Sequence, residues 1–260
     1  MITPVRKRAD RQAPPVPPIR PVRYLVAARH VETYDTVTLM LRPAGNPIQP
    51  PRPGQFTMLY AYGVGEVPVS VSGSHGRTLV QTIRSAGAVT RGLCAAVPGH
   101  MVGVRGPFGT DWQISRADGR DMLIVAGGIG LAPLRPVILA ALAQRAGYDR
   151  VVLLVGARSP SDLIFTRELE TWRRRDADVR VPVDRADARW TGQVGMVTTL
   201  IENAIADPAW TAAFVCGPEI MMRLSAQQLV NCGVAPADIQ VSLEARVLGV
   251  GRVRHAPVRY

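Results

Sequence analysis

Residues 122–133 read MLIVAGGIGLAP, an apolar run followed by a turn that contains three glycines. An uninterrupted apolar run of this kind is typical of a strand buried on both faces of a sheet. Over residues 133–145, Leu134, Ile138 and Leu142 recur on one helical face. The stretch therefore predicts a buried strand, a tight glycine turn and a helix, which together begin a βαβ unit.

The same alternation continues toward the C-terminus. Apolar runs predict strands at 151–155, 179–183, 213–216 and 239–243, and helical periodicity predicts helices at 162–174, 196–206 and 219–231. Strands that alternate with helices imply crossover connections, and hence a parallel, doubly wound sheet with helices on both faces.

Before residue 112 the pattern is different. Short runs bounded by Gly, Pro, Asn or His predict strands at 24–28, 36–41, 55–60, 68–72, 78–84 and 101–105, with one helix at 89–96. Six strands at this spacing predict a small antiparallel β-barrel. We therefore expect a barrel over 22–115 and an α/β domain over 119–244, and 260 residues are enough for two such domains.

The two ends of the chain differ from this body. Residues 1–21 combine a basic start with a proline-rich stretch that has little to bury, which predicts a disordered arm. Of the net charge of +11, residues 1–23 carry +5 and residues 245–260 carry +4. A nucleic-acid-binding protein would more often show a basic stripe on a folded face, with aromatic residues interleaved. We expect no nucleic-acid partner, and interpret the ends as solvated tails or as a docking surface for an acidic protein.

The sequence also bears on location. It has no apolar run of 18 or more residues, and prolines stand at 14–18, where a signal peptide would need an apolar stretch. Its cysteines, Cys94, Cys216 and Cys232, are odd in number and widely spaced, which fits reduced thiols better than a disulfide or metal pattern. We expect a cytoplasmic protein without membrane insertion.

Two short motifs stand at the ends of predicted strands. GGIGLAP at 127–133 offers glycines that let a pyrophosphate approach the backbone, and a helix N-terminus that favours an anion. CGP at 216–218 follows a later strand of the same sheet, and ligands of such sheets bind outside the carboxyl ends of the strands. A plain tight turn and a small buried cysteine are the alternative interpretations. The strand–turn–helix context favours a dinucleotide site.

These motifs, in this order, resemble the ferredoxin–NADP reductase superfamily, in which GGxGxAP holds the dinucleotide pyrophosphate and CGP lies beside the nicotinamide. In the first half, VPVS at 67–70 stands in place of the family's Arg-x-Tyr-Ser/Thr, GAVT at 87–90 matches Gly-x-x-Thr/Ser, and GPFG at 106–109 matches the barrel exit. The string EVPVSVS at 66–72 is similar to the gamma subunits of cytoplasmic nickel–iron (sulf)hydrogenases. One of the subunits of anaerobic sulfite reductase and the electron-transfer subunit of dihydroorotate dehydrogenase are related. The resemblance covers about residues 22–250.

The resemblance implies an FAD site on the barrel. Ser70 would lie near flavin N5, and Pro68 would shape the pocket of the ring. Arg84 would meet the phosphate charge in place of the missing motif arginine, because a guanidinium makes paired hydrogen bonds to phosphate oxygens. An exposed arginine at a strand end is the alternative. The implied flavin-binding residues are Val67, Pro68, Val69, Ser70, Thr82, Ile83 and Arg84, together with Gly87, Val89 and Thr90 at the pyrophosphate.

A second site, for NAD(P), is implied on the α/β domain. Its residues are Gly127, Gly128, Gly130, Ala132, Pro133, Arg158, Cys216, Gly217 and Pro218. Arg158 is placed to meet a 2′-phosphate, which favours NADP over NAD; a surface arginine is the alternative. Ser70 and Cys216 are the residues expected beside the reacting atoms. We name no proton-transfer residue, because in such a hydride transfer the cofactors carry the redox chemistry.

The hydrogenase-type gamma subunits end in a loop of four cysteines that binds a [2Fe–2S] cluster. This sequence keeps Ser242-Leu243-Glu244 and the later Gly-Val-Gly of 249–251, but Leu248, Val253 and Ala256 occupy cysteine positions, and no fourth cysteine follows before Tyr260. Because such clusters are held by thiolates, we expect no [2Fe–2S] cluster and no other metal. Two origins are compatible with this degenerate loop over 245–260, a natural loss of ligands or a damaged reading frame.

The expected function is that of a flavin-containing oxidoreductase subunit. Hydride would pass between NAD(P)H and FAD, and electrons would pass on to a redox partner protein, such as an iron–sulfur or hydrogenase-like subunit. The alternative is a non-catalytic dinucleotide-binding or assembly subunit of such a complex, since the cluster ligands are lost.

Overall fold

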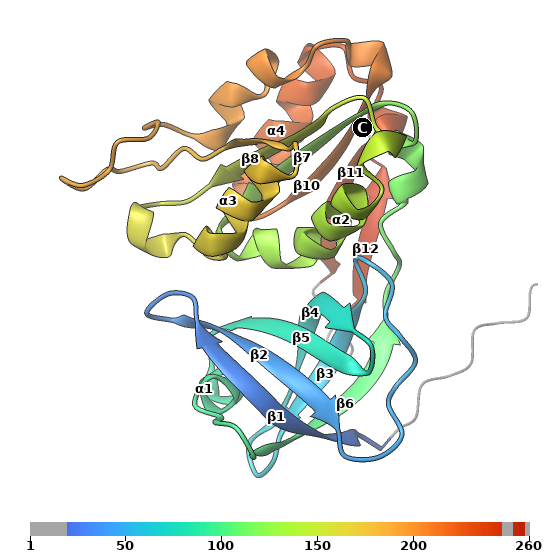
Figure 1. The fold of residues 1–260 in the computed structure, drawn as a ribbon, viewed down its shortest axis with the longest axis vertical. Helices are drawn as coiled ribbons and strands as arrows, with labels where there is room; N and C mark the ends of the chain where they lie inside the picture. The colour runs from blue at the N-terminus through green and yellow to red at the C-terminus, as the bar shows by residue number, and fades with distance from the viewer. Residues whose placement is uncertain (1–19, 246–251, 258–260) are drawn as a thin grey trace, which may run out of the picture.

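The computed structural model describes residues 20–245 and 252–257, which form a β-barrel and an α/β sheet stacked one above the other (Figure 1). The strands of the barrel are β1 (Val22–Val31), β2 (Thr36–Pro43), β3 (Phe56–Ala61), β4 (Gly65–His75), β5 (Thr78–Arg84) and β6 (Met101–Phe108), with helix α1 (Ala88–Cys94). The α/β sheet contains β7 (Asp121–Gly127), β8 (Val151–Gly156), β9 (Asp178–Arg180), β10 (Thr211–Cys216), β11 (Ile239–Ala245) and β12 (Arg252–Pro257), with helices α2 (Leu131–Ala143), α3 (Thr166–Arg174) and α4 (Glu219–Asn231). The 3-10 helices are η1 (Ile114–Ala117), η2 (Gly128–Gly130), η3 (Arg145–Gly147), η4 (Pro160–Asp162), η5 (Val197–Leu200), η6 (Glu202–Ala204), η7 (Pro208–Trp210) and η8 (Pro236–Asp238).

The six strands of the first half close into an antiparallel barrel in the order β1-β2-β5-β4-β3-β6. Its core consists of side chains at alternate strand positions, among them Leu39 and Leu41 on β2 and Ile83 on β5, all at most 2% exposed. This alternation is the period that a strand imposes when one face is buried. The predicted barrel and its helix at 89–96 are confirmed.

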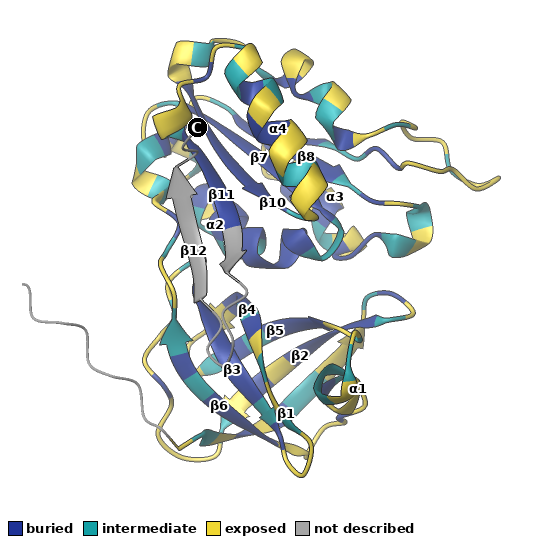
Figure 2. Ribbon diagram, turned by 180° about the vertical axis from the view of Figure 1, so that it is seen from behind, coloured by how far each residue is buried: buried dark blue, intermediate teal, exposed yellow. Residues whose placement is uncertain are grey.

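The second half forms a sheet in the order β12-β11-β10-β7-β8-β9, in which β7 to β11 pair in parallel. Side chains of α2 and α3 fill one face together with Ile124 of β7, and side chains of α4 and η5 fill the other together with Val125. Figure 2 shows these central strands as buried. Successive residues of β7 face opposite layers, which explains the uninterrupted apolar run. The predicted doubly wound sheet is confirmed.

Three predicted elements differ from the structure. The helix predicted at 196–206 is wrong: its place is taken by η5 and η6, although Val197, Ile201 and Ala204 are buried as an apolar helical face would be. The helix predicted at 162–174 begins only at Thr166, after η4. The strand predicted at 179–183 ends at Arg180, because Pro182 has no N–H to donate to a neighbouring strand.

The ends of the chain are only partly described. The predicted arm at 1–21 falls almost wholly outside the described residues. Within the predicted cluster remnant, 246–251 and 258–260 also lie outside them, whereas β12 pairs antiparallel with β11, with Ala245 opposite Arg252. No helix of the described residues is long and apolar enough to cross a membrane.

Candidate functional site

Three strands of the α/β sheet end side by side. In the parallel register, Ala126 of β7 lies opposite Cys216 of β10, and Gly127 lies opposite Gly156 of β8. The loops that leave these strands therefore start at one sheet edge. They carry the predicted glycine turn, CGP motif and Arg158, so the fold brings the predicted NAD(P) residues together.

The glycines of the turn are needed for two physical reasons. Gly128 has φ +53°, a conformation that L side chains rarely adopt, and no other heavy atom lies within 4 Å of the position where its Cβ would stand. Gly130 instead packs against the backbone at the end of the neighbouring strand β10, since a Cβ there would lie 2.6 Å from the amide nitrogen of Gly217. One glycine thus permits the bend and leaves open space in front of it, while the other permits close packing.

The residues beside the turn are also fixed by packing. Ala132 and Pro133 are buried in the first turn of α2, and the indole N–H of Trp112 donates to the carbonyl oxygen of Pro133 at 3.2 Å. Cys216 is only 8% exposed, whereas Pro218 is exposed and directly precedes α4. A ligand at this edge would therefore meet backbone more than side chains.

Arg158 follows β8 at the same edge, and its side chain already has protein partners. Its Nη2 donates to Oδ1 of Asp162 at 2.9 Å, and hydrogen bonds with Asp162 and Tyr34 raise its pKa. The pKa of Asp162 is lowered: burial acts to raise it, but hydrogen bonds from Ser159 and Arg158 outweigh burial. Tyr34 lies between β1 and β2 of the barrel, so this cluster spans both domains.

The predicted flavin residues of β4 and β5 divide between two faces of the barrel. Pro68 is exposed and Ser70 is half-buried, whereas Val67 and Val69 pack against the barrel core. On β5, Thr82 donates to the hydroxyl of Ser72 at 2.9 Å, while Ile83 lies in the core. Consequently Val67, Val69 and Ile83 can offer a ligand only backbone groups, while Pro68, Ser70 and Arg84 can offer side chains.

Arg84 is paired in this structure. Its Nε donates to Oδ2 of Asp35 at 2.7 Å. The pKa of Asp35 is lowered: burial acts to raise it, but hydrogen bonds from Arg84, Thr36 and Thr33 outweigh burial. The charge of Arg84 also helps to lower the pKa of Asp162. The predicted phosphate-binding arginine of the barrel therefore lies near the cluster that contains Arg158.

The predicted pyrophosphate turn before α1 is closed by its own threonine. The hydroxyl of Thr90 accepts hydrogen bonds from the N–H groups of Ala86 and Gly87, at 2.9 and 2.8 Å, and lies 3.1 Å from the carbonyl oxygen of Gly87. Nothing lies within 4 Å of a Cβ at Gly87, so the space before the turn is open. Val89 is half-buried and packs on the barrel core. A ligand here would meet first-turn N–H groups, which lack intrahelical partners.

The sequence analysis predicted Arg84 and Arg158 as site residues but did not predict the side chains that bind them. Asp162 stands four residues after Arg158, a spacing at which helix-like turns pair opposite charges, so this pair had a signal. Asp35 and Tyr34 lie far from their partners along the chain and carried no signal. Among residues 20–245 and 252–257, no cluster of three or more His, Cys, Asp or Glu side chains suits a metal. Leu248 lies outside the described residues, and for Val253 and Ala256 only the backbone is described.

A closed antiparallel barrel followed by a doubly wound sheet, with a glycine turn and a CGP motif packed at one sheet edge, defines a two-domain dinucleotide-binding protein. The oxidoreductase NAD-binding domain family matches residues 124–227. The chain is 37% identical to sulfhydrogenase 1 subunit gamma of Pyrococcus furiosus, over 80% of this chain and 73% of that protein. It is 34% identical to a probable dihydroorotate dehydrogenase B (NAD(+)) electron transfer subunit of Methanocella arvoryzae, over 77% of this chain and 70% of that protein.

The fold is shared with solved structures as well. The FAD/NAD-binding domain of a nitric oxide dioxygenase from Vibrio cholerae superposes with a TM-score of 0.74 at 20% identity, over 85% of this chain and 98% of that one. The chain belongs to the ferredoxin–NADP reductase superfamily of FAD- and NAD(P)-binding oxidoreductases, and within it to the family of the sulfhydrogenase gamma subunits. The predicted resemblance is thereby confirmed.

Proposed function

We propose that this chain is the electron-transfer subunit of a larger redox complex, in which it binds FAD and NAD(P) and passes electrons to a partner protein. The observation that carries the proposal is the contact of Gly130 with the Cys216–Gly217 peptide, which joins the two dinucleotide motifs at one sheet edge. The relatives are named as a gamma subunit and an electron transfer subunit, which supports a subunit role.

The donors of the α/β edge fit a dinucleotide. The space in front of Gly128 is open, the turn leads into the N-terminus of α2, and α2 has 13 residues. First-turn N–H groups and the helix dipole favour a pyrophosphate at such a place. Arg158 adds a guanidinium that suits a 2′-phosphate, so we propose NADP as the preferred dinucleotide.

The barrel residues fit a flavin dinucleotide in the same way. Pro68 and Ser70 present an apolar ring and a hydroxyl on the outer side of β4, Arg84 supplies positive charge, and the turn at Gly87 is open in front. Pairing of Arg84 with Asp35 holds that guanidinium at the end of β5, where a diphosphate would compete for it. We propose that Val67 to Ser70, Thr82 to Arg84, Gly87, Val89 and Thr90 line the flavin site.

When bound, the flavin and the nicotinamide supply the hydride and electron chemistry. The chain itself would bind and orient them. Residues 127–133 would hold the dinucleotide, and Cys216 would lie beside the nicotinamide at the edge of the sheet. Ser70, on the barrel, would offer a hydrogen bond to the flavin. We propose Ser70 and Cys216 as the residues beside the reacting atoms.

The test is reconstitution with FAD followed by anaerobic mixing with NADPH or NADH. We expect about one FAD per chain, a yellow protein, and loss of flavin absorbance on reduction. Cys216→Ala should slow that reduction. The control is Cys232→Ala, which should leave the rate unchanged, because Cys232 is a half-buried residue at the C-terminal end of α4. Failure of wild-type protein to take up FAD would refute the proposal.

A non-catalytic assembly subunit is the second candidate, favoured by Leu248, Val253 and Ala256 at the cysteine positions of the cluster loop. We propose that no [2Fe–2S] cluster is bound, and stoichiometric iron and sulfide in purified protein would contradict this. FAD uptake without reduction by either dinucleotide would favour the assembly role. A cytoplasmic location stays a prediction from the sequence.

A further inference from the structure

An arginine of the α/β domain reaches into the barrel. Arg135 lies on α2, and its Nη1 donates to the backbone carbonyl oxygen of Ser72 on β4 at 2.7 Å. Its Nε is held by both carboxylate oxygens of Glu168, at 2.8 and 3.1 Å, and its guanidinium stands over the ring of Phe165. The guanidinium also occupies the space beside Gly73, where a Cβ would lie 2.6 Å from Nη1. Arg135 is thus built into both domains.

A carboxylate of the barrel makes the reciprocal contact. Oε2 of Glu32, on the loop after β1, accepts the backbone N–H of Phe165 at 2.9 Å, and its Oε1 accepts the hydroxyl of Thr38 at 2.7 Å. Glu32 and Arg135 therefore meet at one residue, Phe165, from opposite domains. We call Arg135, Glu168, Phe165 and Glu32 the domain clamp.

Phe165 has a backbone conformation that needs such support. Its φ is +55°, in the left-handed region, and it directly precedes α3. A non-glycine residue persists in this region only when its surroundings determine the conformation. Here the residue is only 4% exposed, its ring lies beneath the Arg135 guanidinium, and its N–H donates to Glu32, so contacts from both domains hold it.

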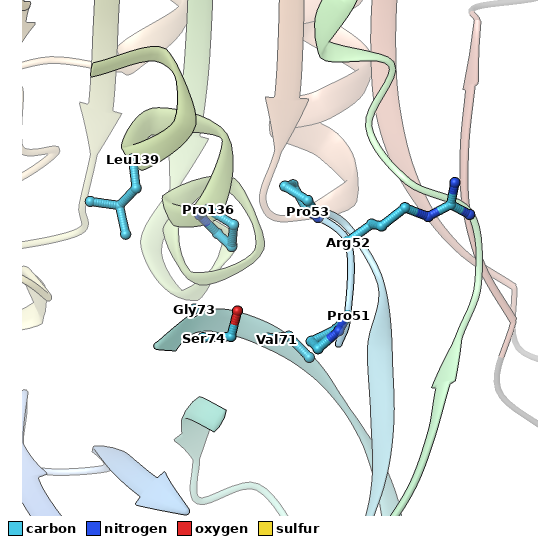
Figure 3. A pocket seen from close by; sticks show the side chains of 8 residues that line it. All are labelled: Pro51, Arg52, Pro53, Val71, Gly73, Ser74, Pro136 and Leu139. Carbon is cyan, nitrogen blue, oxygen red and sulfur yellow. The ribbon is translucent and has the colours of Figure 1, made fainter. Parts of the chain in front are cut away.

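A pocket lies between α2 and the barrel beside the clamp. This pocket has a volume of about 150 Å³ and is lined by Pro136 and Leu139 of α2 and, on the barrel, by Val71, Gly73, Ser74 and residues 51–53. Figure 3 shows these residues around it. Where the pocket opens, apolar side chains of the two domains do not pack against each other. The directional contacts of the clamp lie beside this pocket, at Gly73, and they join the two domains together with the contact of Arg158 with Tyr34.

The clamp is connected to both proposed cofactor sites through rigid elements. Arg135 follows Gly130 by five positions on α2, and Ser72 follows Ser70 by two positions on β4. The hydroxyl of Ser72 is bonded to Thr82 of the proposed flavin site at 2.9 Å. Phe165 ends the loop that carries Arg158. A change in the clamp would therefore shift one site relative to the other.

We propose that Arg135 and Glu32 are positioning residues that fix the orientation of the nucleotide domain on the barrel, and so align the nicotinamide with the flavin. The proposal rests on the proposed function for the alignment, but the opening of the contact between the domains at Phe165 can be measured without cofactors. Misplacement of reacting groups by about 1 Å can cost ~100-fold in rate, so loss of the clamp should appear in the hydride step.

The test compares Arg135→Ala, Arg135→Lys, Glu32→Ala and Glu32→Gln with Arg120→Ala. Arg120 is a matched control, because it binds both carboxylate oxygens of Asp238 and three backbone carbonyls, those of Arg116, Ala209 and Thr211, none of them on the barrel. Hydrogen–deuterium exchange is measured on protein without FAD, and reduction by NADPH is measured on protein saturated with FAD. Arg135→Lys retains the charge and one bond, and replaces Arg135→Ala if that variant does not fold.

We expect Arg135→Ala and Glu32→Ala to raise amide exchange at Phe165 at least about tenfold and to slow flavin reduction at least about tenfold, with the Kd for NADPH changed less than about threefold. The conservative variants should be intermediate and Arg120→Ala unchanged at Phe165. Unchanged exchange in both alanine variants, or raised exchange with an unchanged reduction rate, would overturn the proposal. If wild-type protein takes up no FAD, the proposed function fails, while exchange at Phe165 in Arg135→Ala, which keeps Glu32 as the acceptor, still decides whether Arg135 supports this contact between the domains.

Discussion

The backbone of Gly130 lies so close to the end of β10 that a Cβ at this position would stand 2.6 Å from the carbonyl carbon of Cys216. Real Cβ atoms are not found at such distances from backbone atoms, and neither backbone can move without disturbing a strand or a helix. The glycine turn and the CGP motif therefore depend on each other sterically. This dependence accounts for glycine at position 130 whether or not a ligand is bound.

Gly130→Ala should destabilise the protein by at least about 2 kcal/mol, as expected when extra volume is forced into a packed interior. Gly147→Ala is the control, because nothing lies within 4 Å of its added Cβ. That change should alter the free energy of unfolding by less than about 0.5 kcal/mol. Urea denaturation measures both, and equal midpoints for the two variants would contradict the steric explanation.

A second prediction concerns dinucleotide choice. Arg158→Ala should weaken binding of NADPH by about 10- to 150-fold, the equivalent of one charge-assisted hydrogen bond, and change binding of NADH little. Asp162→Asn should strengthen NADPH binding, because it removes a carboxylate that competes for the guanidinium at 2.9 Å. Isothermal titration with both dinucleotides measures this.

The control for this pair is Arg167→Ala, which removes an exposed arginine from the nearby helix α3. It should leave the ratio of the two affinities unchanged. If Arg158→Ala weakens both dinucleotides equally, or neither, then Arg158 does not select for the 2′-phosphate.

A third prediction follows from the lowered pKa of Asp35. A carboxyl group whose pKa is lowered by folding contributes stability above its ordinary pKa, near 4, and that contribution is lost as the pH falls through the lowered value. Wild-type protein should therefore lose stability below about pH 4 more steeply than Asp35→Asn, whose side chain does not titrate. Denaturation at a series of pH values tests this, and parallel curves for the two proteins would refute it.

Sequence patterns predicted the layers of this fold well because burial has a simple period. The barrel strands alternate, and the run at 122–126 faces two helical layers at once. At 196–206 the apolar residues at helical spacing are buried, but the predicted helix does not form. Two adjacent β-branched residues, Thr198 and Thr199, disfavour a regular α-helix there. Spacing indicates which face is buried, whereas the backbone hydrogen-bond pattern also depends on tertiary packing.

The contacts between the domains were not predictable from the sequence. Phe165 adopts a backbone conformation that is rare for an aromatic residue, and the sequence around it gives no sign of this conformation. Glu32 bonds with an amide 133 positions away. Such pairs depend on how two finished domains meet, which hydrophobic periodicity does not encode. The motif residues, in contrast, are contiguous in the sequence and were recognisable.

The last prediction concerns the basic C-terminal segment and the partner protein. Arg252 and Arg254 lie on β12, while Arg246 and Arg259 lie outside the described residues. We expect the segment to dock an acidic acceptor such as a ferredoxin-like subunit, so electron transfer to that acceptor should slow as salt rises. Exposed charges act mainly on association rates and are screened over about 8 Å at physiological salt. Reduction of the flavin by NAD(P)H should depend on salt much less.

The pairing of β12 with β11 determines which variants can test this prediction. Deleting residues 246–260 would remove β12 from its pairing with β11, so a deletion would mix charge with folding. Arg252→Gln with Arg254→Gln keeps the backbone pairing and removes two charges. This variant should slow transfer to the acceptor about two- to tenfold at low salt and flatten its salt dependence. Arg167→Gln with Arg174→Gln removes the same charge from α3 and should change neither. A β12 variant with the wild-type, salt-sensitive rate would exclude these arginines and leave the basic N-terminal arm as the docking candidate.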